Sequence, residues 1–280
     1  MNRRYRAFSF VDRIDELTIG RSAAGRYAVS DTIDLFPTSL VAEAVGQLAA
    51  WSVMAATDFR LRPVAGIAGR IEFGDPPRPG DILTLSAVID ALDDDSVTYH
   101  GEARCEGRLL VRLFDCIGPM LPMQDFDEPA DVRRQFERVR GEGAEPFGFA
   151  GFPDLPLTPL PGESGNSAGT EFTVPATLDL FGDHFPRRPV LPGTILMHQN
   201  LVLATAIAAR IPTLVHGTAW SLVALSEVKI RAFTPPGERI ELAGQADDST
   251  GTELSVAIES RMKGRMIAGS RAEFKAMAAR

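Results

Sequence analysis

The sequence is poor in cysteine, has no excess of basic side chains and contains no long apolar run, and each shortage argues against a class of protein. Its two cysteines, Cys105 and Cys116, form no CxxC motif, which argues against a disulfide framework and a structural zinc site and favours a reducing cytoplasm. The 37 acidic side chains outnumber the 29 basic ones, so nucleic acid is not an expected partner. No uninterrupted apolar window reaches about 18 residues, and we expect no membrane-spanning segment.

The chain does contain enough hydrophobic material for two domains. Of its 280 residues, 45% are hydrophobic and 24% are charged, and this length fits two units of ordinary domain size. Short sequences recur in the same order in the two halves. Residues 32–36 (TIDLF), 79–81 (PGD) and 107–110 (GRLL) correspond to 177–181 (TLDLF), 236–238 (PGE) and 264–267 (GRMI). The interval from Gly80 to Gly107 equals that from Gly237 to Gly264, at 27 residues, so we interpret the chain as a duplication.

Each repeat predicts the same series of elements. A short strand is expected to end near Leu35 or Leu180, followed by a helix over 39–56 or 194–209 that is apolar nearly all round, as a helix enclosed on most sides would be. Alternating β-rich segments follow each helix. They lie at 81–88, 96–101 and 108–116 in the first repeat and at 239–244, 253–260 and 266–274 in the second. One buried helix followed by antiparallel strands indicates an α+β unit in which the sheet wraps the helix.

The two repeats are separated by a segment of different composition. Residues 121–170 contain seven prolines and seven glycines, which is typical of a linker. One helical segment interrupts it at 131–140, with apolar residues spaced to dock on one face. We therefore expect a first unit over 1–120, a linker over 121–170 and a second unit over 171–280.

The most informative segment is GDHFPRRPVLPG at 182–193, which leads from His184 through three prolines into the second helix. A helix N-terminus offers unpaired N–H groups and the positive end of the helix dipole, so the Gly193 N–H suits a developing oxyanion. The first repeat lacks this loop, since Pro37 follows directly on the residue that corresponds to Phe181. Taken alone, the pattern also fits a loop histidine that is hydrogen bonded for structure.

The stretch HFPRRPVLPG at 184–193 resembles the active-site loop of the β-hydroxyacyl-[acyl carrier protein] dehydratases of the hot-dog fold. In that family an acidic residue stands on the helix six positions after the proline of the Pro-Gly pair, within Glu-Ala-x-x-Gln. The second repeat has His198 at that position, whereas the first has Glu43 within EAVGQ at 43–47. Each repeat therefore keeps one half of the family's catalytic pair.

The resemblance implies a double hot-dog, an intramolecular pseudo-dimer whose two helices lie side by side. Active sites of the family take their histidine from one unit and their acid from the other, so one site here would combine His184 with Glu43. The resemblance assigns removal of the C2 proton to His184 and protonation of the departing C3 hydroxyl to Glu43. It assigns binding of the thioester oxygen to the Gly193 N–H. The candidate substrate-binding residues are Phe185, Pro192, Gln47, Arg187 and Arg188.

Each candidate also has a structural interpretation. Glu43 could be a charge on a narrow exposed stripe of its helix; if it is buried, its pKa rises and it stays protonated, as a general acid requires. Arg187 and Arg188 could be solvated loop charges, or could contact the phosphate of phosphopantetheine or an acidic carrier protein. We interpret His198 as a core or pocket-wall residue, so the second, pseudo-equivalent site would be inactive.

The expected activity is dehydration of a 3-hydroxyacyl thioester to the trans-2-enoyl thioester in fatty acid or polyketide biosynthesis. The substrate would carry phosphopantetheine, on an acyl carrier protein or in coenzyme A. No metal or redox cofactor is expected, because proton transfer and an oxyanion donor suffice. An acyl thioesterase on the same fold and a non-catalytic acyl-binding subunit are the alternatives. The residues leave open the acyl chain length, an added isomerase activity and a homodimer of double hot-dogs.

Overall fold

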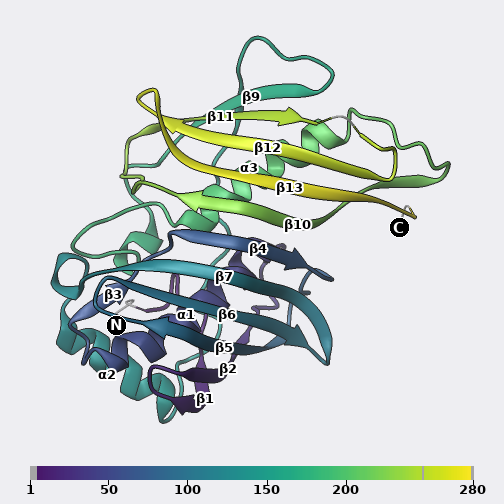
Figure 1. The fold of residues 1–280 in the computed structure, drawn as a ribbon. Helices are drawn as coiled ribbons and strands as arrows, with labels where there is room; N and C mark the ends of the chain where they lie inside the picture. The colour runs from purple at the N-terminus through teal and green to yellow at the C-terminus, as the bar shows by residue number, and fades with distance from the viewer. Residues whose placement is uncertain (1–4, 248, 279–280) are drawn as a thin grey trace.

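The computed structural model describes residues 5–247 and 249–278, which form two units joined through one continuous antiparallel sheet (Figure 1). The first unit contains β1 (Arg13–Thr18), β2 (Ser22–Ala28), α1 (Thr38–Ala56), β3 (Leu61–Pro63), β4 (Ile67–Phe73), β5 (Ile82–Leu92), β6 (Ser96–Cys105) and β7 (Arg108–Pro122). The connection contains η1 (Met123–Asp125), α2 (Pro129–Arg140) and β8 (Thr158–Pro159). The second unit contains β9 (Ser167–Thr173), η2 (Asp179–Gly182), α3 (Gly193–Ala208), β10 (Thr218–Ile230), β11 (Arg239–Ala246), β12 (Glu253–Met262) and β13 (Arg265–Ala278).

The order of the strands repeats on either side of the junction between the units. The sheet runs β1-β2-β5-β6-β7-β4-β10-β13-β12-β11-β9-β8, and β3 pairs with β7. Outward from the junction, β4-β7-β6-β5-β2 in one unit corresponds to β10-β13-β12-β11-β9 in the other. At the junction, β4 and β10 are antiparallel, with Arg70 opposite Ser226. Arg70 also donates two hydrogen bonds, of 2.9 and 3.0 Å, to the carboxylate of Glu273 on β13.

The glycines that define the sequence repeat occupy equivalent turns. Gly80 and Gly237 precede β5 and β11, and Gly107 and Gly264 connect β6 to β7 and β12 to β13. All four have a positive φ, between 74° and 83°. Residues with a β-carbon rarely adopt this conformation. The shared 27-residue interval therefore reflects two turns that both units need.

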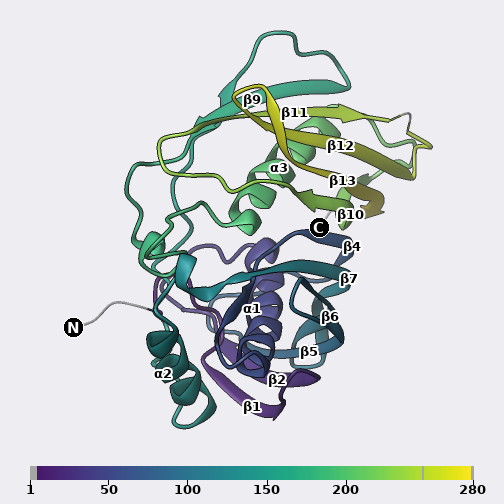
Figure 2. The same ribbon diagram turned by 60° about the vertical axis from the view of Figure 1, so that its left-hand side comes forward.

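Each unit wraps its sheet around one long apolar helix (Figure 2). In α1 the buried residues include Leu40, Val41, Val45 and Leu48, on a helix that Pro37 starts without a side-chain cap. By length and composition α1 could cross a membrane, but 67% of the relevant window is buried inside the protein. We therefore interpret α1 as the core helix of its unit.

The predicted α+β pattern is confirmed, with corrections at element ends. Both helices and all six strands named from the sequence are present, within a few residues of the expected positions. The strands expected to end near Leu35 and Leu180 were wrong, because β2 ends at Ala28 and Leu180 lies in η2. The predicted start of the second unit at 171 falls inside β9, because β9 pairs with β11 from Ser167 onward.

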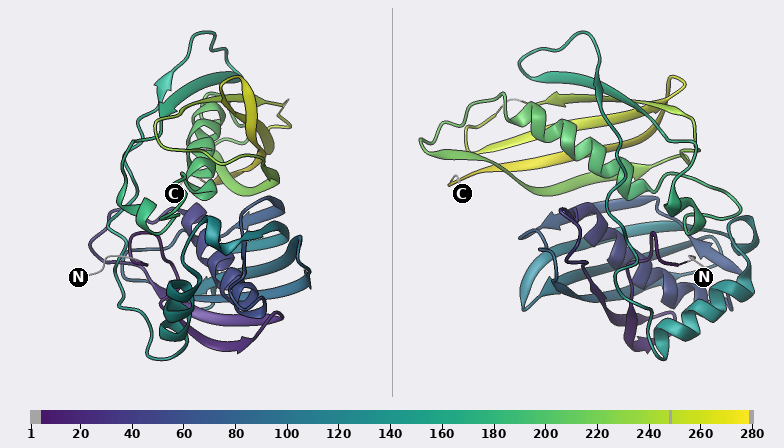
Figure 3. Two further views of the ribbon diagram at one scale, coloured as in Figure 1. Left: turned by 90° about the vertical axis from the view of Figure 1, so that its left-hand side faces the viewer. Right: turned by 180° about the vertical axis from the view of Figure 1, so that it is seen from behind.

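The linker lies against both units. Its helix α2 packs on the first unit, where Phe136 meets the rings of Trp51 and Phe59 at centroid distances of 6.1 and 5.4 Å. From α2 the chain passes over the helices, on the side away from the sheet, before entering β9 (Figure 3, right). The linker therefore crosses the face of the helices that the sheet leaves open.

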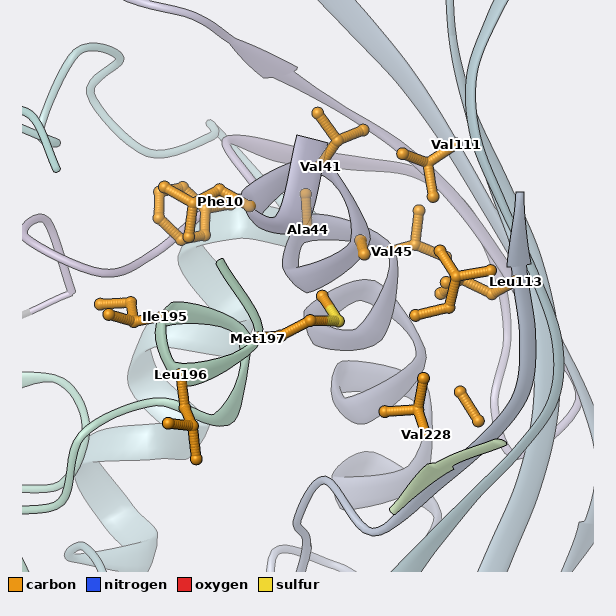
Figure 4. Packing of buried hydrophobic residues seen from close by; sticks show 14 of the residues in the cluster. Phe10, Val41, Ala44, Val45, Val111, Leu113, Ile195, Leu196, Met197 and Val228 are labelled. Carbon is orange, nitrogen blue, oxygen red and sulfur yellow. The ribbon is translucent and has the colours of Figure 1, made fainter. Parts of the chain in front are cut away.

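The cores of the two units are continuous at the junction. Figure 4 shows Met197 of α3 between the two helices, near Val45 of α1 and Val228 of β10. All three side chains belong to one buried cluster that extends through both units. This packing places the first turn of α3 beside α1, where the candidate site lies.

Candidate active site

His184 lies in the loop between η2 and α3, with its ring fixed by a hydrogen bond to the backbone. The Nδ1 atom is 3.2 Å from the Val190 carbonyl oxygen. Because a carbonyl only accepts, Nδ1 carries the hydrogen and donates it. The Nε2 atom of the neutral ring is then left as the proton acceptor. The loop thus presents a histidine in the tautomer that a general base needs.

Aromatic packing and burial keep this histidine neutral. The Phe185 ring stacks on His184 at a centroid distance of 3.9 Å, and Phe8 packs edge-on at 5.4 Å. Burial, together with the nearby Arg62 guanidinium, lowers the pKa of His184 to about 3. The His184 ring is therefore unprotonated at Nε2 over the whole neutral range.

Glu43 lies on α1 with both of its carboxyl oxygens hydrogen bonded. Gln47, one turn later on the same helix, donates from Nε2 to Oε1 at 3.0 Å. Thr194, in the first turn of α3, donates from its hydroxyl to Oε2 at 2.8 Å. Burial raises the pKa of Glu43, although both hydrogen bonds and Arg62 act in the opposite direction. The exposed-stripe interpretation of Glu43 does not apply, because the carboxyl faces the second unit.

The structure brings His184, Glu43 and Gly193 to one cavity of about 320 Å³. The cavity lies between α1, the first turn of α3 and strands β4, β7 and β10. Gly193 is the first residue of α3, so its N–H has no acceptor within the helix and is available to a ligand. A base, an acid and an N–H donor from two different units therefore line one space.

The candidate substrate-binding residues are divided between the cavity and the surface. Phe185 and Gln47 line the cavity, whereas Pro192 lies outside the lining as the N-cap of α3. Arg187 forms an ion pair with Glu128. Arg188 lies over the Phe233 ring, 4.4 Å from its centroid. Both arginines are exposed and contact neighbouring segments, and neither lines the cavity. Their contact with a phosphate or an acidic carrier protein stays a prediction.

Sequence reasoning missed the N-terminal segment, which forms one wall of the cavity. Tyr5 and Phe8 line the cavity, and both donate backbone N–H groups to the Asp183 carboxylate. Burial raises the pKa of Asp183, although these hydrogen bonds act in the opposite direction. Asp183 immediately precedes His184. The same loop therefore carries the histidine and binds the N-terminal segment whose Phe8 packs against it.

Arg62 on β3 was also missed, and it is a cationic side chain in the wall of this site. It lines the cavity, and its guanidinium lies 4.3 Å from the centroid of the Phe185 ring. Burial lowers the pKa of Arg62, and nearby acidic groups, Glu43 and Asp183 among them, act in the opposite direction. No sequence motif marks this arginine, which reaches the site because β3 pairs with the end of β7.

The pseudo-equivalent second site is filled by aromatic side chains. Phe36 packs against Phe10 and Phe149 at centroid distances of 5.5 and 5.8 Å. The His198 ring lies 4.4 Å from that of Phe152. Burial lowers the pKa of His198 to about 4. Two of these phenylalanines belong to the linker, which therefore occupies the space that a second active site would need.

We expect His198→Gln to retain turnover within a few-fold of the wild-type rate. A neutral, buried imidazole is a poor proton donor at pH 7, and His198 lies outside the cavity lining. Steady-state kinetics on the variant, with a thermal melt to verify folding, check this prediction. A folded His198→Gln protein without activity would show that the second site contributes to the reaction.

Comparisons with known proteins connect this geometry to enzyme families. Residues 161–270 match the ApeI-like family, described as ApeI dehydratase. A 102-residue stretch is 30% identical to the 3-hydroxyacyl-[acyl-carrier-protein] dehydratase FabZ of Anaeromyxobacter sp. (strain K). That alignment covers 35% of this chain and 64% of the relative, which is less than two thirds of its length.

Solved structures share the fold over nearly the whole chain. A structure from Lactobacillus plantarum, titled an oleoyl thioesterase, has a TM-score of 0.61 at 11% identity and covers 94% of this chain and 100% of that one. An acyl-ACP thioesterase from Bacteroides thetaiotaomicron has a TM-score of 0.53 at 10% identity, with 91% and 98% covered. At such low identity these likenesses show the hot-dog fold alone. The chain therefore has a double hot-dog arrangement, and its second unit is similar to a family of dehydratases.

Proposed function

We propose that the protein dehydrates a 3-hydroxyacyl thioester to the trans-2-enoyl thioester at one site built by both units. The observation that supports this most directly is the shared cavity, where His184 of the second unit and Glu43 of the first are both lining residues. Their environments push their pKa values in opposite directions, toward a neutral base and a protonated acid. Such a pair is suited to moving one proton off carbon and another onto oxygen.

The proposed reaction uses three groups of this chain. The Nε2 atom of His184 takes the C2 proton, and the electron pair forms the C2–C3 double bond. The Gly193 N–H, at the positive end of α3, binds the thioester oxygen where negative charge develops. Glu43 gives its proton to the C3 hydroxyl as the C3–O bond breaks, and water leaves. The proposed chemistry calls for no metal or redox cofactor.

The apolar lining of the cavity supports an acyl substrate. Beyond the polar groups its lining is mostly apolar and follows α1 through Gly46 and Ala50 toward Trp51 and Met54. Apolar walls of this kind favour a hydrocarbon chain over a polar one. We propose a phosphopantetheine thioester, on acyl carrier protein or coenzyme A, as the carrier, and fatty acid or polyketide biosynthesis in the cytoplasm as the setting.

Thioester hydrolysis is the second candidate, since the same fold occurs in proteins titled thioesterases. Hydrolysis needs a group that activates water as a general base. Burial holds Glu43 toward its protonated form, which favours proton donation instead.

Mass spectrometry of the acyl products separates these functions. With 3-hydroxyacyl thioesters of several chain lengths, on both carriers, we expect the acyl group to lose one water while the thioester stays intact. Because a catalyst accelerates both directions, the assay is also run from the trans-2-enoyl thioester. Release of free thiol with an unchanged 3-hydroxy acid would identify a thioesterase. No change on any substrate would identify a non-catalytic acyl-binding protein.

A further inference from the structure

The two oxygens of the Glu43 carboxyl have different kinds of hydrogen-bond partner. Oε1 faces the side-chain amide of Gln47, and Oε2 faces the hydroxyl of Thr194. An amide nitrogen can only donate, whereas a hydroxyl can donate or accept. The Gln47 contact can therefore only donate to Glu43, whereas the Thr194 contact can donate to ionised Glu43 or accept a hydrogen from protonated Glu43.

The Gln47 amide is locked in one orientation by the N-terminal segment. Its Oε1 atom accepts the Phe10 backbone N–H at 2.8 Å. Its Nε2 atom donates one hydrogen to the Phe8 carbonyl at 3.1 Å and the other to Glu43 Oε1 at 3.0 Å. Turning the amide over would place a carbonyl against a carbonyl and an N–H against an N–H. Glu43 Oε1 therefore faces an N–H donor whether Glu43 is protonated or ionised, and the acidic hydrogen is disfavoured on this oxygen.

The Thr194 hydroxyl has no such constraint. Among the residues that the structure describes, Glu43 is its hydrogen-bond partner. Pro192 is the N-cap of α3, which has no side-chain capping hydrogen bond. The hydroxyl is thus not needed to start the helix. It can rotate to accept a hydrogen from a protonated Oε2 or to donate to an ionised one.

We propose that Thr194 is a positioning residue for the acid: protonated Glu43 holds its hydrogen on Oε2 against the Thr194 oxygen, and the hydroxyl turns to donate to Glu43 once that hydrogen has left. This inference rests on the proposed role of Glu43 as general acid. The hydrogen moves from Oε2 to the C3 hydroxyl oxygen of the substrate, while the hydrogen of Thr194 stays on its own oxygen. Thr194 directly follows Gly193, so one turn of α3 supplies the oxyanion donor and orients the acid.

Thr194→Val and Thr194→Ser test this role. Valine keeps the branched shape and removes the hydroxyl, and serine restores it. Loss of the hydroxyl removes a charge-assisted hydrogen bond to ionised Glu43, which costs that form more than it costs the neutral one. The pKa of Glu43 is therefore expected to rise by about one unit in Thr194→Val. Thr205→Val, on an exposed position of the same helix, is the matched control.

Two measurements test these variants: turnover as a function of pH, and an infrared titration of Glu43. Turnover is expected to fall roughly 10-fold or more in Thr194→Val, with the alkaline limb of the pH profile displaced about one pH unit upward, because the reaction needs protonated Glu43. Thr194→Ser and Thr205→Val are expected to match the wild type. Infrared titration of the Glu43 carboxylic acid band, identified by its loss in Glu43→Gln, should show the same displacement without any substrate.

The infrared titration separates this inference from the proposed function. A displaced titration in a protein that dehydrates nothing would support the role of Thr194 at the carboxyl and contradict the dehydratase. An active wild type, with Thr194→Val unchanged in rate and in both titrations, would overturn the role of Thr194. So would Thr194→Ser behaving like valine, since only the hydroxyl is restored.

Discussion

Replacing His184 with alanine is expected to lower turnover of a 3-hydroxyacyl thioester at least about 100-fold, the usual contribution of a general base. The variant loses Nε2, the ring nitrogen that is unprotonated in the wild type because Nδ1 carries the hydrogen donated to the Val190 carbonyl. It also loses ring contacts with Phe185 and Phe8, so a lower melting temperature is expected. His184→Gln, which fills more of the space, should be as inactive and more stable.

Kinetics below the melting temperature of each variant measure this effect. The fold is verified by circular dichroism, and binding of a substrate analogue shows whether the cavity survives. Normal binding with lost turnover is the expected outcome. Full activity in either variant would remove His184 from the mechanism.

The pH dependence of kcat/KM should report the same histidine. The base is active when neutral, so activity falls as the pH drops through its pKa in the free enzyme. With the pKa of His184 lowered to about 3, no histidine limb should appear between about pH 5 and 7, where an ordinary histidine titrates. An acid limb near pH 6.5 that disappears in His184→Gln would show that the ring is more solvated than the structure indicates.

Glu43→Gln is expected to cost a similar factor, at least about 100-fold, because the amide keeps the shape but cannot supply a labile proton. The substitution also removes the group whose ionisation should produce the alkaline limb of the profile. Glu43→Ala is the companion variant, and the polar groups of Gln47 and Thr194 would then lose their partner. Wild-type turnover in Glu43→Gln would exclude Glu43 as the acid.

The double variant, His184→Ala with Glu43→Gln, tests whether the two groups act together. We expect its loss to be far smaller than the product of the single losses, because removing either group disables the same step. Rates of all four proteins under one set of conditions give the coupling. Losses that multiply would indicate two independent contributions and would contradict a shared site.

The parts of the fold that were predictable are those with a local signal. The turns at Gly80 and Gly237 need a positive φ, so both repeats have glycine at the same position. These matching glycines made the repeat recognisable in the sequence. The helix of the second unit was predictable because a mostly apolar stretch follows Pro192 and Gly193. The ends of β2 and β9 were not predictable from residues near Leu35 and Leu180, because pairing with β5 and β11, rather than local sequence, determines where they stop.

The residues of the candidate site were likewise predictable only where the sequence carries a local signal. His184 and Glu43 were found because a motif and its repeat position mark them. Arg62 and Asp183 reach the cavity through tertiary contacts, with β7 and with the N-terminal segment, and no spacing in the sequence signals this. Thr194 did have a signal, since it is the first hydroxyl after the Pro-Gly pair, but its partner lies 151 residues away.

The most direct test of one composite site per chain is the stoichiometry of labelling by a mechanism-based acyl thioester inhibitor. Intact-mass spectrometry counts the adducts on each chain, and peptide mapping locates them. Among the described residues that line the cavity, His184 is the only histidine, and the Phe152 ring packs against His198 outside it. We therefore predict saturation at one adduct per chain, on His184, and no adduct in His184→Ala. Two adducts per chain, or an adduct on His198, would contradict the account.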